Sequence, residues 1–127
     1  MVERQLRIQS CPPIRNALRI LEEERSWHIS QQELAGRVHV STAYFSRLFR
    51  RILGQTFSDY LTGRRMREAQ NLLHMTRLPI RDIAAMLGYS RQSYFARRFR
   101  NVTGMTPTDY RRNRPHHAAE DDWGDRA

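Results

Sequence analysis

Lysine is absent from the sequence, so all 22 of its basic residues are arginine. Arginine carries a planar fork of hydrogen-bond donors that suits phosphate groups and guanine edges, whereas lysine presents a point charge. An arginine-rich codon bias explains the missing lysines equally well. Under either explanation the surface of the protein displays guanidinium groups.

Cysteine and long apolar runs are also scarce. Cys11 is the only cysteine, which excludes an intramolecular disulfide and favours a reducing compartment. The first ten residues, MVERQLRIQS, lack the apolar run of a signal peptide. No other stretch approaches the ~20 apolar residues of a membrane span. We therefore expect a cytoplasmic protein that has no membrane partner.

The motifs of common enzymes and metal sites are missing as well. There is no Gly-rich phosphate loop, no HExxH pattern and no paired-cysteine zinc spacing. His28, His39 and His74 are scattered along the chain, and no third ligand is evident for the pair His116-His117. We expect no catalytic residue, no metal and no cofactor.

What the sequence does contain is a large positive charge, placed unevenly. The formal net charge is +9, and the segment from Pro115 onward holds four acids against Arg126, a net −3. Residues 1–114 therefore carry +12, the difference between +9 and −3. A basic body of this kind indicates a polyanionic partner. The alternative is a basic, solvated surface that binds nothing.

The chain also contains an internal repeat. Residues 44–60 read YFSRLFRRILGQTFSDY and residues 94–110 read YFARRFRNVTGMTPTDY, with nine identities in seventeen ungapped positions. Each copy has aromatic residues at helical spacing, arginines between them, and a glycine followed by a new helix start. Two copies indicate a duplicated module rather than a solenoid.

Hydrophobic periodicity predicts an all-α fold with about seven helices. In the first half, residues 1–11 are polar and are expected to be flexible. A helix is predicted from Pro12-Pro13 to about Arg25, and a second from the capping box that begins at Ser30 to about Val38. The recognition helix of a first helix-turn-helix, at about 41–53, is predicted to begin at the cap Ser41 and to stop at Gly54.

The second half repeats this plan. Thr56 to Asp59 resembles another capping box, and the long helix that it opens is predicted to reach Met75, about 19 residues or roughly 28 Å. A helix from Pro79 to Gly88 precedes a second basic helix at about 91–103, which Ser90 is expected to cap and in which Val102 is expected to face inward with Phe95 and Phe99. The predicted domains are a flexible segment 1–11, helix-turn-helix subdomains 12–55 and 77–114, a linker helix 56–76, and a disordered acidic tail 115–127.

Both basic helices are predicted to expose small, amide and arginine side chains on one face, and neither contains an acidic residue. Such a helix fits the major groove of DNA, which is roughly 12 Å wide. Two of them must lie about 34 Å apart to read one face of the duplex, and the long helix has a suitable length. A solvated helix face is the alternative, and the duplication makes it less favoured.

These motifs resemble the DNA-binding domain of the AraC/XylS family of bacterial transcription regulators over about residues 12–113. The most specific part is IAAMLGYSRQSYFARRFRNVTGMTPTDYRR, from Ile83 to Arg112. The first half is similar at Leu34-Ala35, Ser41, Tyr44-Phe45 and Gly54. The resemblance implies seven helices and two helix-turn-helix units joined by a bridging helix.

The resemblance also implies how the chain works: a monomer inserts two helices into successive major grooves of promoter or operator DNA and acts with RNA polymerase, associated with the nucleoid when bound. The positions that match base-reading sites in the family are Thr42, Ala43, Ser46, Arg47, Gln92, Ser93 and Arg97. Phosphate contacts are expected at Arg50, Arg51, Arg100 and the helix start Thr106. The sequence does not decide between activation and repression. It also does not decide between a stand-alone regulator and an output domain excised from a longer protein.

Two departures from the family pattern matter. Arg98 stands where the first copy has Leu48, so its stem is expected to pack while its head reaches solvent or phosphate. Ala43 and Ser46 are small, so the second motif is expected to carry more of the specificity.

The alternative functions are a basic module for protein interaction or for non-specific nucleic-acid binding, and a membrane-surface role. Some DNA-repair alkyltransferases carry a similar unit, but they need several reactive cysteines.

Overall fold

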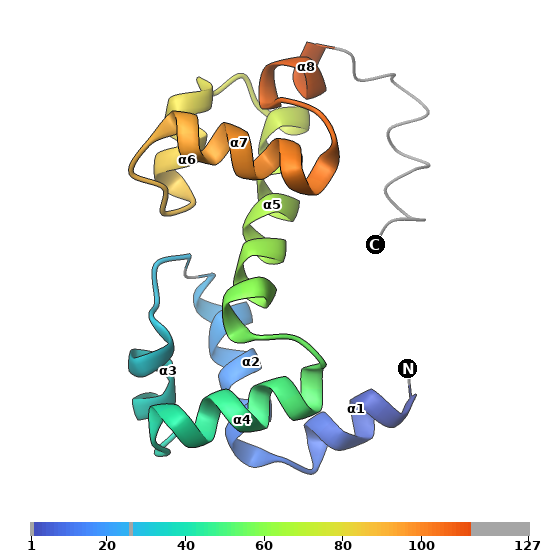
Figure 1. The fold of residues 1–127 in the computed structure, drawn as a ribbon, viewed down its shortest axis with the longest axis vertical. Coiled ribbons are helices and arrows are strands. Elements are labelled where there is room, and N and C mark those ends of the chain that lie inside the picture. Colours follow the sequence, from blue (N-terminus) through green and yellow to red (C-terminus); the bar gives the residue numbers. More distant parts are fainter. Residues whose placement is uncertain (1, 26, 113–127) are drawn as a thin grey trace. The chain divides into compact units, whose positions relative to one another are not determined.

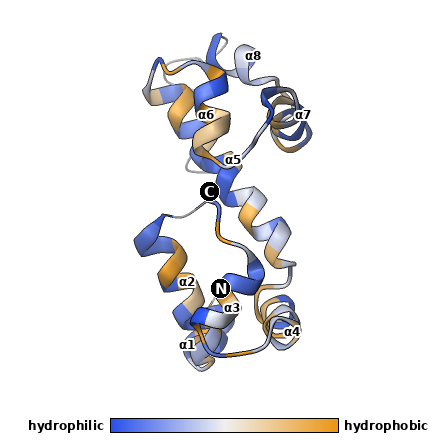
Figure 2. Cartoon of the chain, turned by 90° about the vertical axis from the view of Figure 1, so that its left-hand side faces the viewer, coloured by the Kyte–Doolittle hydropathy of each residue, from blue (hydrophilic) through white to orange (hydrophobic). Residues whose placement is uncertain are grey.

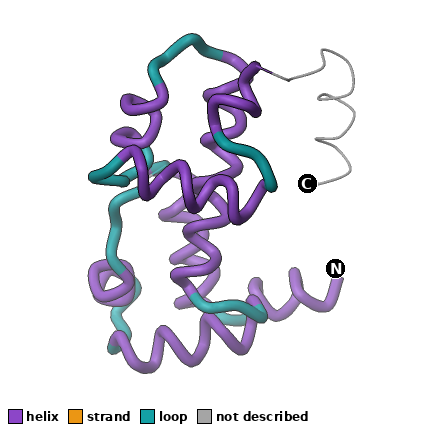
Figure 3. The backbone as a smooth tube through the Cα atoms, turned by 45° about the horizontal axis from the view of Figure 1, so that its top comes forward, coloured by secondary structure: helices purple, strands orange, loops and turns teal. Residues whose placement is uncertain are grey.

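The computed structural model of the protein describes residues 2–25 and 27–112, and every described residue lies in a helix or in a link between helices (Figures 1 and 3). The all-α prediction is confirmed for this part of the chain, with eight helices instead of about seven. The chain divides into two compact units, Met1–Arg64 and Arg65–Ala127. The predicted acidic tail 115–127 lies outside the described residues. No helix in the described part is both long and apolar enough to cross a membrane.

The first unit contains four helices and the beginning of a fifth. They are α1 (Val2–Gln9), α2 (Pro12–Glu24), α3 (Gln31–Arg37), α4 (Thr42–Leu53) and the first part of α5 (Phe57–Met75). The predicted caps are confirmed: Ser30 Oγ accepts the Glu33 N–H at 3.0 Å, and Ser41 Oγ accepts the Tyr44 N–H at 3.1 Å. These bonds satisfy backbone donors that a helix start leaves unpaired.

Helix α1 was not predicted, because its segment is polar and short. In the structure Ile8 is buried, and the Arg4 guanidinium donates a 2.9 Å hydrogen bond to the carbonyl of Leu53 at the end of α4. Helix α1 packs against α2 and α4. Short helices are marginal in isolation and depend on tertiary packing, so contacts with residues about fifty positions away make this segment helical.

The core of the first unit is built around aromatic rings. Phe49 has ring centroids of Phe45, Phe57 and Tyr60 at 5.6, 5.6 and 5.3 Å. Ile14 on α2 and Leu34 on α3 pack in the same cluster and are fully buried. This cluster fixes the inner face of α4, and thereby fixes which face of α4 points outward.

The second unit contains the end of α5 and three further helices, α6 (Ile80–Met86), α7 (Gln92–Thr103) and α8 (Pro107–Arg112). Figure 2 shows the mixture of hydrophilic and hydrophobic residues along α2 and α6 that gives each helix one buried face. The buried side chains of this unit include Met66 and Leu73 from α5, Ile83 from α6, and Phe95 and Phe99 from α7.

Two predictions for α7 are wrong. Ser90 does not cap the helix: the cap position is Arg91, whose side chain makes no capping hydrogen bond. The reason lies in the spacing, because Ser41 precedes Tyr44 by three residues whereas Ser90 precedes Tyr94 by four. Val102 was expected to face inward but is 54% exposed. Helix α1 packs against α4 in the first unit, and the described residues of the second unit contain no corresponding helix.

Candidate nucleic-acid interface

Helix α4 presents a polar face opposite its buried phenylalanines. Phe45 and Phe49 are fully buried, so residues at helical offsets away from them point outward. The predicted base-reading positions on this face are exposed except for the half-buried Thr42, and they are Thr42, Ala43, Ser46 and Arg47. Arg50 and Arg51, the predicted phosphate contacts, are exposed in the last turn. The structure therefore brings this predicted set together on one helix, and its roles toward DNA stay predictions.

Helix α7 presents the matching face in the second unit. Phe95 and Phe99 are fully buried, and the predicted readers opposite them, Gln92, Ser93 and Arg97, are exposed. The phosphate position Arg100 is exposed in the last turn. Arg98 is half-buried, as expected for an arginine whose stem packs along the helix.

The exposed arginines on these two faces have no acidic residue beside them on their own helix. Neither α4 nor α7 contains an acidic residue. Within residues 2–25 and 27–112, ion pairs form between Arg37 and Glu24, Arg64 and Glu22, and Arg81 and Asp82. The exposed arginines of α4 and α7 take part in none of them. Their guanidinium groups are thus available to an external anion, and phosphate and guanine are ligands that this fork of donors suits.

The inner geometry of the two copies agrees closely. The Phe45–Phe49 and Phe95–Phe99 centroids lie 5.6 and 5.9 Å apart, and the Phe49–Tyr60 and Phe99–Tyr110 pairs lie 5.3 and 5.6 Å apart at interplanar angles of 71° and 76°. The glycine at each helix end is left-handed, with φ +78° at Gly54 and +86° at Gly104. The repeat in the sequence is therefore a repeat in structure, with the aromatic residues packed inward as predicted.

The outer faces differ more than the inner ones. The Arg47 guanidinium carbon lies 6.0 Å from the centroid of the Tyr44 ring, at the limit of a cation–π contact. At the corresponding place in the second unit, Tyr94 pairs with the ring of Tyr89 at 5.9 Å. The tyrosine that flanks each reading face thus has a different neighbour in each unit.

The helix starts that follow the two glycines are also alike. Thr56 Oγ1 accepts the Asp59 N–H at 3.1 Å, and Thr106 Oγ1 accepts the Asp109 N–H at 3.0 Å. Both threonines therefore cap the helix that follows them. Because Thr106 uses its oxygen as the cap of the six-residue helix α8, its contact with phosphate stays a prediction.

Several arginines have roles that the sequence did not reveal. Arg111 on α8 donates to the carbonyls of Leu78, Thr76 and Leu73 at 2.7, 3.2 and 3.3 Å. On α5, Arg64 and Arg65 lie over aromatic rings. Of these contacts, only the one between Tyr60 and Arg64 could have been predicted from the sequence, because residues four apart on a helix are neighbours.

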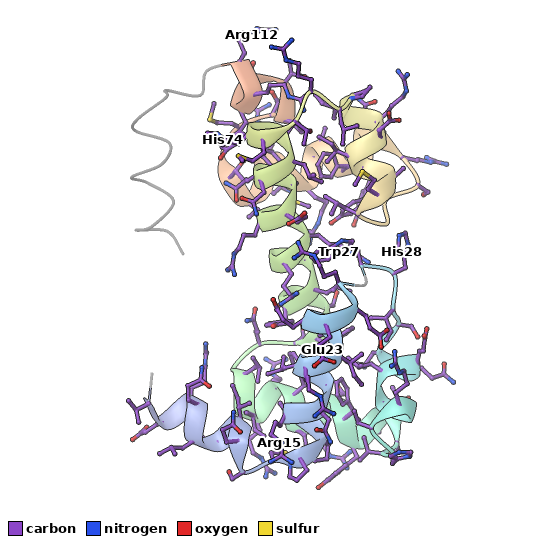
Figure 4. All side chains as sticks on the ribbon, turned by 180° about the vertical axis from the view of Figure 1, so that it is seen from behind. Arg15, Glu23, Trp27, His28, His74 and Arg112 are labelled. Atoms are coloured by element: carbon purple, nitrogen blue, oxygen red, sulfur yellow. The ribbon has the colours of Figure 1, made fainter. Side chains whose placement is uncertain are left out.

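A pocket of about 360 Å³ lies at the end of α5, lined by Leu73, His74, Met75, Thr76, Arg77 and Arg111 (Figure 4 labels His74). The Arg111 guanidinium in its wall is already bonded to three backbone carbonyls. In the described part of the chain no group of three or more His, Cys, Asp or Glu residues is placed to hold a metal ion. His116-His117 lie outside that part.

Comparisons with known proteins agree with this geometry. The model of a helix-turn-helix domain family matches residues 34–113. The regulatory protein PocR of Salmonella typhimurium is 34% identical over 80 residues, which are 63% of this chain and 26% of PocR. This chain spans between 10% and 27% of the length of the curated relatives that it matches.

Solved structures are similar over most of the described chain. An AraC-type transcriptional regulator from Chromobacterium violaceum is 30% identical, with a TM-score of 0.75 over 86% of this chain and 97% of that one. The DNA-binding domain of AdpA, a global transcriptional factor solved in complex with a target DNA, is 25% identical, with a TM-score of 0.71 over 80% of this chain and 91% of that one.

Proposed function

Because the chain belongs to the AraC-type helix-turn-helix family, we propose that it binds double-stranded DNA sequence-specifically and regulates transcription. One observation carries the proposal above all. The chain builds two helices of matched inner geometry, and each exposes an arginine-bearing face that contains no acid. A similar domain has been solved with its target DNA.

The residues have distinct roles in this proposal. Arg47 and Arg97 read guanine edges, and Gln92 reads adenine, because their donors and acceptors match those base edges in the major groove. Thr42, Ala43, Ser46 and Ser93 line the two faces and shape the contact with the bases. Arg50, Arg51 and Arg100, together with the helix start at Thr106, hold phosphates and fix the register of the protein on the duplex.

A monomer is sufficient for this binding mode. The two reading helices belong to one chain and are joined by α5, whose 19 residues correspond to roughly 28 Å. Reading helices on one face of DNA require a separation of about 34 Å. The two faces carry different side chains, so the preferred site is asymmetric. At a promoter, RNA polymerase is the expected protein partner, and the bound protein belongs to the nucleoid.

Selection of duplexes from a random pool tests the proposal. We expect an enriched, asymmetric site of about two helical turns. Fluorescence anisotropy at physiological salt should then show the selected duplex bound at least about 10³-fold tighter than a scrambled duplex of equal composition. Equal affinity for every duplex would reject the proposal and leave a non-specific nucleic-acid-binding module. A palindromic site occupied by two chains would reject the monomeric mode alone.

A further inference from the structure

Two consecutive arginines on α5 lie at the boundary between the units. Arg64 is the last residue of the first unit and Arg65 is the first residue of the second. Each lies over aromatic side chains of its own unit. Successive residues of an α-helix point about 100° apart, since a turn holds 3.6 residues. One turn of α5 therefore carries a contact to each unit.

Arg64 is embedded in the first unit. Its guanidinium carbon lies 5.6 Å from the ring centroid of Trp27 and 5.9 Å from that of Tyr60. Its Nη1 pairs with the Glu22 carboxylate at 3.1 Å, and the arginine side chain is only 19% exposed. Burial acts to lower the pKa of Arg64, but Tyr60 and Glu22 raise it and the net shift is upward. Figure 4 labels Trp27, in the link between α2 and α3 beside α5.

Arg65 makes the corresponding contact in the second unit. Its guanidinium carbon lies 5.3 Å from the ring centroid of Tyr89, which is 8% exposed. The Tyr89 ring lies 5.4 Å from that of Phe95, and Phe95 lies 5.9 Å from Phe99. Arg65 thus rests on the aromatic cluster that supports the inner face of α7, as Arg64 rests on Tyr60, whose ring lies 5.3 Å from that of Phe49 on α4.

Leu61 and Met66 are buried on either side of these contacts, but the backbone of α5 has one weak position beside them. Gly63 directly precedes the two arginines, and a glycine in a helix interior costs up to ~1 kcal/mol relative to alanine. A side chain added at Gly63 would meet nothing within 4 Å, so no packing requirement explains this glycine. The contacts of Arg64 and Arg65 therefore lie directly after a position of low helix propensity.

We propose that Arg64 and Arg65 are positioning residues that fasten each unit to its part of α5 and so set the spacing between the two DNA half-sites that the domain accepts. This inference rests on the proposed function. Without the two contacts, each unit still reads its own half-site, but the pair tolerates half-sites at other spacings. Binding energy is then gained on duplexes that the intact protein rejects.

The test uses the selected duplex and derivatives with one or two base pairs inserted or removed between the half-sites. Each base pair changes the rotation between half-sites by about 35°, from 10–10.5 base pairs per turn. Affinities are measured for the intact protein, Arg64→Met, Arg65→Met and the double variant. Methionine keeps an unbranched side chain and a similar helix propensity without the charge. Arg67→Met, an exposed arginine of α5, controls for the lost charge.

We expect the ratio of affinities between the optimal and shifted duplexes to fall by roughly 2- to 30-fold in the double variant and to stay unchanged in Arg67→Met. Affinity for a duplex with a single half-site should match that of Arg67→Met, which also shows that the units are folded. Arg64→Lys and Arg65→Lys keep the cation over the rings and should retain most of the ratio. If the double variant does not fold, the affinity ratios of Arg64→Met and Arg65→Met test the inference in its place.

Three results overturn the inference. The double variant could keep the ratio of the intact protein, or Arg67→Met could lower it equally. The intact protein could also bind its selected sequence specifically without any preference for spacing. In each of these cases the proposed function stands. If the intact protein prefers no duplex at all, both the inference and the proposed function fail.

Discussion

The two reading helices α4 and α7 share their inner packing, but their ends are held differently. Helix α4 is capped at its start by Ser41 and at its end by Arg4, which donates to the Leu53 carbonyl. Helix α7 has no side-chain cap at its start. At its end Thr103 lies 2.8 Å from the Phe99 carbonyl and accepts the Met105 N–H at 3.2 Å. The end of α4 is therefore stabilised by α1, which is distant in the sequence, whereas the end of α7 is stabilised by a side chain of α7 itself.

A second difference lies directly after the repeat. Leu61 in the first unit is buried, and the position fifty residues later is Arg111, which bonds three carbonyls around the end of α5. An apolar contact in one unit is replaced by polar bonds in the other. The two copies therefore share the residues that orient the reading face, which are the phenylalanines and the glycine at the helix end. The contacts that hold the ends of each reading helix differ between the copies.

The largest effects should come from the shared aromatic core. Phe49→Ala and Phe99→Ala should each destabilise by about 3–5 kcal/mol. Phe49 has three aromatic ring neighbours and Phe99 has two, and one aromatic pair contributes about 0.5–1.5 kcal/mol beyond its buried area. Urea denaturation followed by circular dichroism should show the larger loss for Phe49→Ala. The exposed Val102→Ala should change the free energy of unfolding by less than ~0.5 kcal/mol. An equal or larger loss for Phe99→Ala would contradict the comparison.

The polar contact of the second unit should matter next. Arg111→Met leaves three carbonyls without their donor, and hydrogen bonds that involve a charged group contribute about 1.5–3 kcal/mol each. Because the site is only partly buried, we expect a total loss of about 2–3 kcal/mol by urea denaturation. Arg112→Met is the matched control, since Arg112 is exposed on the same helix (Figure 4). Equal stability of the two variants would show that water replaces these bonds without cost.

The two faces should contribute unequally to DNA specificity. Arg97→Ala should cost about 1–3 kcal/mol on the selected duplex and relax base choice. Arg47→Ala should relax it less, because Ala43 and Ser46 beside it are small. Arg50→Ala should weaken all duplexes alike and reduce the salt slope by about one unit. Selection repeated with each variant measures the change in base choice, and anisotropy titrations at several salt concentrations measure the loss of affinity and the salt slope. A site preference left unchanged by Arg97→Ala would remove Arg97 as a reader.

The sequence allowed prediction of features that depend on local spacing. The buried faces of α4 and α2, the caps Ser30, Ser41 and Thr56, and the left-handed glycines follow from residues within a few positions of each other, and the structure confirms them. The candidate reading faces could be predicted because they lie opposite phenylalanines at helical spacing. The features that were missed depend on contacts between residues far apart in the sequence. They are the packing of α1 against α4, the hydrogen bonds of Arg111 around the end of α5, and the contacts of Arg64 and Arg65 with the rings of Trp27 and Tyr89.

The failed prediction of a cap at Ser90 gives the sharpest comparison between the two helix starts. Ser41→Ala should cost about 1 kcal/mol, because it removes a bond to the Tyr44 N–H that forms at 3.1 Å. Ser90→Ala should change stability by less than ~0.5 kcal/mol, since the cap position of α7 is Arg91 and makes no side-chain capping bond. Arg91→Ser places a capping residue three positions before Tyr94, and should stabilise by up to about 1 kcal/mol. Thermal unfolding of the three variants measures these differences. A loss at Ser90 equal to that at Ser41 would mean that α7 begins one residue earlier in solution.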